Sequence, residues 1–257
     1  MAANEPGQPG VSDGPSGAPF SIDLPTPPVA LAIGAHPDDV EFGAGGTLAK
    51  WSTAGCVVHH LVCTDGSKGT WDPDSDPATL VVTRQHEQRA AARALGATGQ
   101  VVFLGWPDGE LESGLRQRWE VAYWIRRLQP SVVLGHDPWK RYRLHPDHRH
   151  AGLLACEAIV AARDPHFFPE QQLAHHRPGT LLLWEADQPD HAEDVSGCVD
   201  RKLGALEAHE SQFESTMKAA DEEQMAAFRD RVRARLADNG THAGLASAEL
   251  FKRISDL

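Results

Sequence analysis

The feature that most constrains the fold is an alternation of short apolar runs with longer segments of helical character. The apolar runs lie at residues 29–34, 57–63, 101–104, 131–135 and 181–184. Helical patterns lie at residues 43–54, 83–95, 115–128 and 147–162. Short apolar runs without polar alternation are typical of strands that are buried on both faces of a parallel sheet. This order predicts a single α/β domain whose mostly parallel sheet carries helices on both faces.

The two ends of the chain differ from this central pattern. Residues 1–27 are rich in Gly, Pro, Ser and Asp and contain few large apolar side chains. Such a segment cannot bury enough surface to offset its ordering entropy, so we expect it to be disordered or to lie along the surface. The folded domain is then expected to span residues 28–257, and its C-terminal part to be mostly helical over residues 195–236.

Charge and composition exclude several classes of partner. The 257 residues carry a formal net charge of −12, which argues against nucleic-acid binding and against tight docking on an anionic membrane. We find no apolar run long enough to span a membrane and no signal-peptide pattern. The four cysteines form no C-x-x-C pair, which predicts reduced thiols in a cytoplasmic protein. The sequence leaves the oligomeric state open, and a homo-oligomer is compatible with it.

A His-Pro-Asp tripeptide occurs twice, and each copy is followed by a residue that can bind a metal ion. The first copy reads His36-Pro37-Asp38-Asp39, and the second reads His145-Pro146-Asp147-His148. In one helical turn the first and fourth residues of each copy would face the same side. Each copy follows a predicted strand, and ligands of open parallel sheets bind beyond the carboxyl ends of the strands. The two motifs therefore predict one metal site of the kind that hydrolytic enzymes use for zinc.

Structural explanations compete with this interpretation. Proline favours the first helical position, and a carboxylate at a helix start stabilises it by ~0.3–1 kcal/mol, which alone would explain Asp38 and Asp147. Two such motifs at two strand ends favour the metal site. The glycines at 43, 45 and 46 lack the G-x-G-x-x-G pattern, so dinucleotide binding is disfavoured. Among the other histidines, we expect His136 at the edge of the site, His209 over the pocket, and one of His59 and His60 in solvent.

The sequence resembles the LmbE / PIG-L de-N-acetylases in a series of short motifs. The two His-Pro-Asp motifs with residues 35–47 and 145–148 carry most of the resemblance. The further matches are Thr64-Asp65-Gly66, Arg84 with Glu87, residues 104–108 and, more weakly, Lys202, His209 and Ser211-Gln212. The resemblance covers residues 29–213 and implies a Rossmann-like fold that holds one zinc ion. It also implies removal of acetyl groups from small N-acetylated amino sugars or glycoconjugates, with zinc-bound water as the nucleophile.

The resemblance also implies roles for individual residues. The zinc ligands would be His36, Asp39 and His148, and Asp38 would be the general base. His145 would stabilise the oxyanion or protonate the leaving amine, and Asp147 would orient its ring. The substrate-binding residues would be Arg84, Asp108, Arg143 and Tyr142. Some family members have a Tyr where this sequence has Arg143, so the choice between Arg143 and Tyr142 as an oxyanion helper stays open.

Alternative functions share parts of this site. A zinc amidase that cleaves a larger amide would need the same chemistry and a different pocket. A non-catalytic metal-binding or sugar-binding protein would have no need of Asp38. The sequence leaves the natural substrate open, and also the metal, because two His and one Asp accept several divalent ions.

Overall fold

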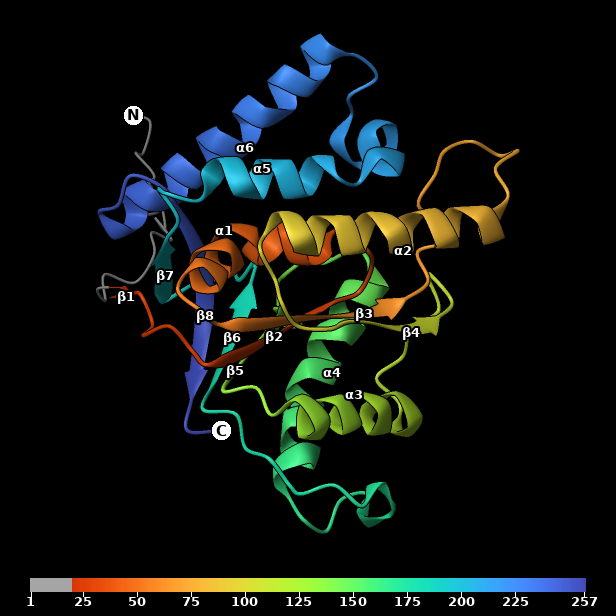
Figure 1. The fold of residues 1–257 in the computed structure, drawn as a ribbon, viewed down its shortest axis with the longest axis vertical. Helices are drawn as coiled ribbons and strands as arrows, with labels where there is room; N and C mark the ends of the chain where they lie inside the picture. Colours follow the sequence, from red (N-terminus) through yellow and green to blue (C-terminus); the bar gives the residue numbers. More distant parts are fainter. Residues whose placement is uncertain (1–19) are drawn as a thin grey trace, which may run out of the picture.

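A mixed eight-stranded sheet forms the centre of the molecule in the computed structural model, which describes residues 20–257 (Figure 1). The strand order is β1-β7-β8-β6-β5-β2-β3-β4. The strands are β1 (Ser21–Ile22), β2 (Val29–Gly34), β3 (Val57–Thr64), β4 (Val101–Trp106), β5 (Val132–His136), β6 (Thr180–Trp184), β7 (His191–Asp194) and β8 (Ala248–Ser255). Strand β8 runs antiparallel to β6 and β7, and the other pairs are parallel. The predicted mostly parallel sheet is confirmed.

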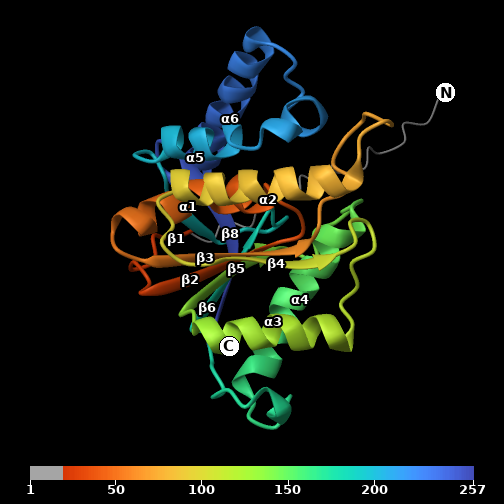
Figure 2. The same ribbon diagram turned by 45° about the vertical axis from the view of Figure 1, so that its right-hand side comes forward.

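Helices cover both faces of the sheet (Figures 1 and 2). On one face lie α1 (Asp39–Thr53), α2 (Pro77–Ala94), α5 (Val199–Glu207) and α6 (Glu222–Ala243), and on the other lie α3 (Leu115–Leu128) and α4 (Pro146–Arg163). Strand β2 shows why both faces are apolar: Leu31 and Ile33 enter one buried cluster, and Ala30 and Ala32 enter the other. Within residues 20–257, none of the helices combines the length and the apolar character that a membrane span requires.

The element boundaries differ from the predicted ones where polar side chains begin a helix. Helix α2 starts at Pro77, inside the segment that the sequence suggested as loop, because the Asp76 carboxylate caps the N–H groups of Ala78 and Thr79. Helix α1 starts at Asp39 rather than near Gly43. Three short helical segments follow α4 and α5, at Pro169–Gln171, Glu210–Gln212 and Phe213–Met217.

Three strands, β1, β7 and β8, were not predicted from the sequence. Strand β8 (AELFKRIS) and β7 (HAED) contain charged residues, so no apolar run marks them, and β1 has only two residues. Strand β1 pairs with β7 and lies within the segment 1–27, of which residues 1–19 lie outside the described residues. The expectation that one of His59 and His60 faces solvent was wrong, because both are buried.

Helix α1 is kinked shortly after it begins, at Ala44, whose φ is −144° and ψ is 15°. The Glu249 carboxylate of β8 accepts hydrogen bonds from Gly46 N (2.9 Å) and Thr47 N (2.8 Å), just beyond the kink. Lys202 of α5 donates from Nζ to Glu249 Oε1 at 2.6 Å. Both charged side chains are buried. The second part of α1 is therefore capped by a residue about two hundred positions away in the sequence.

The loops after β2 and β5 meet at a switch point in the sheet. Strands β3 and β4 lie on one side of β2, whereas β5 and β6 lie on its other side. Crossovers therefore diverge between β2 and β5, which are hydrogen-bonded neighbours. In open α/β sheets this divergence leaves a crevice beyond the carboxyl ends of the strands, where ligands bind. Both His-Pro-Asp motifs lie at this crevice.

Candidate metal and catalytic site

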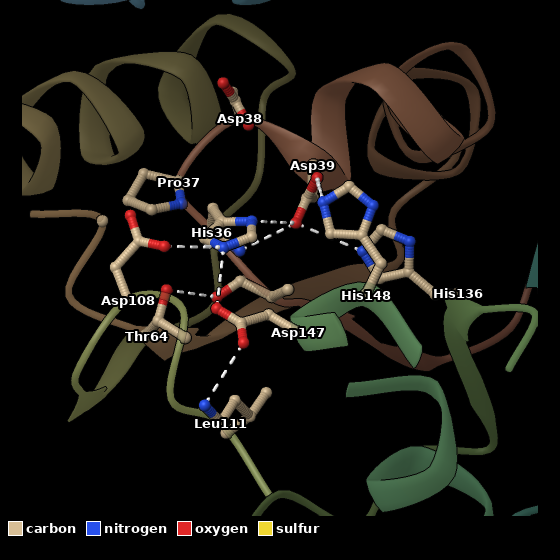
Figure 3. Close-up of polar contacts among 12 residues, drawn as sticks. His36, Pro37, Asp38, Asp39, Thr64, Asp108, Leu111, His136, Asp147 and His148 are labelled. Atoms are coloured by element: carbon tan, nitrogen blue, oxygen red, sulfur yellow. Dashed lines mark hydrogen bonds and ion pairs between the residues drawn. The ribbon is translucent and has the colours of Figure 1, made fainter. Parts of the chain in front are cut away.

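The first motif forms the turn that joins β2 to α1. His36 N donates to Asp39 Oδ2 at 2.7 Å, which holds the turn closed. Asp38 has φ of 107°, in the left-handed region that is unusual for a residue with a Cβ atom. This backbone conformation separates the two adjacent carboxylates. Asp39 points toward His136 and His148, whereas Asp38 points away from them (Figure 3).

The second motif begins α4 in the way that its proline predicts. His145 is the N-cap residue, Pro146 is the first helical residue, and His148 falls in the first turn. The His145 ring is exposed and lies 4.6 Å from the His36 ring and 4.7 Å from the His148 ring, measured between centroids. Three histidine rings from two distant segments thus meet at one place.

The three predicted metal ligands converge (Figure 3). His36 Nδ1 lies 3.4 Å from Asp39 Oδ2, and His148 Nε2 lies 3.4 Å from Asp39 Oδ1. These two distances end at different oxygens of Asp39, and one donor atom from each of the three residues lies within 4.8 Å of the other two. Two imidazoles and one carboxylate would leave the fourth position to a water molecule or a substrate. The donor set therefore fits a catalytic divalent metal ion.

His136, which we expected at the edge of the site, lies directly against these donors. Its Nε2 atom is 3.2 Å from Asp39 Oδ2, and its ring stacks on that of His148 at 4.4 Å. Trp184 Nε1 donates to His136 Nδ1 at 3.0 Å, which leaves the proton of a neutral ring on Nε2, facing Asp39. His136 therefore supports Asp39 from the end of β5.

The second nitrogen of His36 faces two carboxylates. His36 Nε2 lies 3.1 Å from Asp147 Oδ2 and 3.2 Å from Asp108 Oδ1. Asp147 also accepts from the N–H groups of Gly109 (2.6 Å) and Leu111 (3.2 Å). Asp147 thus makes its hydrogen bonds to His36 and to the backbone. The resemblance had implied instead that Asp147 orients the ring of His145. A carboxylate behind a metal-binding histidine fixes its tautomer and raises its basicity.

The surroundings shift the pKa values of these groups in different directions. Burial raises the pKa of Asp38 to about 6, with the charge of Arg84 opposing the shift and that of Asp39 adding to it. Burial would also raise the pKa of Asp39, but His148 and His136 hold that pKa well below the usual value. Burial lowers the pKa of His148 to about 4. At neutral pH, Asp39 is therefore ionised and His148 is neutral, as a metal site requires.

The four residues predicted to bind substrate occupy different environments. Arg84 is 2% exposed and donates to Gly66 O (2.9 Å) and Pro37 O (2.6 Å), and Asp108 accepts from Lys68 N (3.0 Å). Arg143 is buried, and its Nη1 donates to Glu185 Oε2 at 2.9 Å and lies 3.4 Å from His148 Nδ1. Tyr142 is 86% exposed. Of the two candidate oxyanion helpers, Arg143 is the one beside the donors, and the roles of all four residues stay predictions.

One cavity of about 620 Å³ opens over the site. Its wall contains Asp38, the three donors and His145, and it continues past Phe42 to α6. Small-molecule sites commonly measure roughly 300–1,000 Å³, so the cavity has the size of a ligand site. His209, expected over the pocket, is instead fully buried and absent from the cavity wall, with Nε2 at 3.3 Å from Glu41 Oε2.

The fold and the site together define an α/β protein with a cluster of His and Asp side chains that could hold a metal ion at the switch point of its sheet. The family model PIG-L, described as GlcNAc-PI de-N-acetylase, matches residues 31–159. The diacetylchitobiose deacetylase of Thermococcus kodakarensis is 37% identical over 199 residues, which cover 76% of this chain and 74% of the relative. The chain belongs to the PIG-L family of de-N-acetylases, as the motifs indicated.

Two further comparisons define the range of this family. The solved structure of N,N'-diacetylchitobiose deacetylase from Pyrococcus horikoshii superposes with a TM-score of 0.81 at 28% identity, covering 89% of this chain and 84% of that chain. The 4-oxalmesaconate hydratase of Pseudomonas putida is 27% identical and covers 69% of this chain and 71% of the relative. Similarity within this group therefore extends to an enzyme that is named for a different reaction.

Proposed function

We propose that the protein is a zinc-dependent hydrolase that removes the acetyl group from the amide nitrogen of a small N-acetylated amino sugar or glycoconjugate. The observation that carries the proposal is the joint position of Asp38 and the donors His36, Asp39 and His148 in the wall of one cavity. The deacetylases among the relatives support the reaction, and the donor set of two imidazoles and one carboxylate supports zinc.

The chain's own residues would divide the chemistry as follows. A divalent ion at His36, Asp39 and His148 would supply an acidified water molecule and polarise the amide carbonyl. Asp38, which is not among the donors, accepts the proton from the attacking water, and a pKa of about 6 leaves it ionised at neutral pH. The carbon–nitrogen bond then breaks once the leaving amine receives a proton. The products are acetate and a free amine.

His145 is the second group at the cavity that can act on the substrate. Its ring lies at the cavity wall, where partial burial and the charge of His36 lower its pKa. We propose that it donates a hydrogen bond to the oxyanion or a proton to the amine. Removal of one such donor commonly lowers the rate by ~10²–10³.

The test of the proposal is the pair Asp38→Asn and Asp74→Asn, which make the same chemical change inside the cavity and on an exposed loop. Each variant is assayed on N-acetylglucosamine and N,N'-diacetylchitobiose for released amine and released acetate. We expect Asp38→Asn to keep its metal, measured by mass spectrometry, and to lose nearly all turnover, while Asp74→Asn keeps both.

Four outcomes would contradict the proposal. Full turnover in Asp38→Asn would remove Asp38 as the base. Turnover that survives removal of all metal by a chelator would remove the metal. Cleavage of larger amides without any acetate release would favour the amidase alternative, and water addition to a double bond without amine release would favour a hydratase.

The cellular compartment and the oligomeric state were also considered in the sequence analysis. The four cysteines are free thiols in the structure, which supports a reducing compartment such as the cytoplasm. The oligomeric state stays open, and a homo-oligomer is compatible with the sequence.

A further inference from the structure

A single peptide unit of the first motif is held at both ends by helix α2. Arg84 Nη2 donates to Pro37 O at 2.6 Å, and Gln88 Oε1 accepts from Asp38 N at 2.9 Å. These two atoms belong to the same peptide bond, between Pro37 and Asp38. Arg84 and Gln88 are four residues apart on α2, so they share one face of the helix. Their side chains are 2% and 0% exposed.

The held peptide is the one that sets the unusual conformation of Asp38. A residue with a Cβ atom in a sparsely populated backbone region persists only where its surroundings over-determine it. The φ of Asp38 is 107°, and rotation of the Pro37–Asp38 peptide plane is the motion that would relax it. The same rotation would turn the Asp38 carboxylate away from its present place in the cavity wall.

The amide of Gln88 is itself fixed in one orientation. Gln88 Nε2 donates to Glu41 Oε1 at 2.7 Å and lies 3.2 Å from His60 Nδ1. Because the carboxylate of Glu41 can only accept, the nitrogen of Gln88 must face Glu41 and its oxygen must face Asp38 N. Gln88 and Glu41 are absent from the cavity wall, so Gln88 has no access to a substrate.

We propose that Gln88 is a positioning residue for Asp38: together with Arg84 it clamps the Pro37–Asp38 peptide and thereby fixes the direction of the Asp38 carboxylate. The proposal rests on the role of Asp38 in the proposed function. It gives Arg84 a structural task in addition to the sugar contact that the sequence suggested.

The test compares Gln88→Met with Gln85→Met, which makes the same change on α2 at a side chain without a hydrogen bond among the described residues. We expect kcat of Gln88→Met to fall by about 10²-fold, the size of effect that a 1 Å misplacement produces. KM and metal content should stay within twofold of wild type, and Gln85→Met should match wild type throughout. If Gln88→Met does not fold, Arg84→Lys tests the other end of the same peptide with the same expectation for kcat.

A double-mutant cycle separates positioning from a merely structural role. In an Asp38→Asn background the carboxylate is already gone, so adding Gln88→Met should change the residual kcat by less than twofold. An equal fall in both backgrounds would overturn the positioning role. Wild-type kcat in Gln88→Met with an inactive Asp38→Asn would overturn the clamp and leave the proposed function intact, whereas wild-type kcat in Asp38→Asn would overturn both.

Discussion

The substitution Glu249→Gln tests how much of the stability depends on the cap inside α1. The Glu249 carboxylate accepts from Gly46 N and Thr47 N and pairs with Lys202, and it is 3% exposed. A glutamine there would present an N–H group to partners that are all donors, and it would leave the Lys202 charge buried without its counterion. Breaking a buried ion pair by removing one partner commonly costs about 3–5 kcal/mol.

Thermal and denaturant unfolding, followed by circular dichroism, would measure this loss. For a chain of this size each kcal/mol lowers the melting temperature by roughly 2–4 °C, so the expected fall is about 6–20 °C. The matched control is Asp200→Asn, which breaks the exposed pair of Asp200 with Arg233 and should change the unfolding free energy by no more than about 0.5 kcal/mol. A loss below about 1 kcal/mol in Glu249→Gln, within the range of an ordinary point mutation, would refute the reasoning.

Three further predictions concern the metal donors and the far end of α4. His148→Ala should lose both bound metal and turnover, and unchanged metal content by mass spectrometry would discredit this ligand. Burial would lower the pKa of His36, but Asp108, Asp147 and Asp39 raise it well above the ordinary value, so the metal-free ring keeps its proton to a higher pH than a free imidazole. Metal affinity should therefore rise with pH until that pKa is passed; calorimetry in buffers of different ionisation enthalpy would show the released proton, and its absence would contradict the assignment. Arg126 donates to carbonyl oxygens of Ala161 and Ala162 at the end of α4 and of Asp164 just after it, so Arg126→Met should lower the unfolding free energy by roughly 3 kcal/mol, measured by urea titration, whereas a change near zero would mean that water replaces these bonds.

The sequence predicted the central sheet and the donors because both leave a local signal. Strand β2 is buried on two faces, so its six residues contain no charge and read as a strand without any tertiary information. His36, Asp39 and His148 stand in short motifs whose spacing already suggests a metal, and their place after strands brings them to one crevice.

What the sequence could not supply depends on contacts between distant segments. Strand β8 contains the carboxylate of Glu249, which caps α1, and this contact exists only in the folded state. The resemblance implied that Asp147 orients the His145 ring, whereas in the structure the Asp147 carboxylate lies 3.1 Å from His36 Nε2. Gln88 belongs to none of the motifs, and its proposed positioning role follows from the hydrogen bond that Asp38 N donates to its side chain.

The position of β8 in the sheet has a consequence for how the molecule is assembled during synthesis. This strand follows all the others along the chain, yet it lies between β6 and β7, and the pair β1–β7 joins the remaining strands through it. A nascent chain that has emerged only as far as α6 lacks the one strand through which the β1–β7 pair is hydrogen-bonded to the rest of the sheet. Completion of the sheet and docking of that edge must therefore wait until residues 248–255 have left the ribosome.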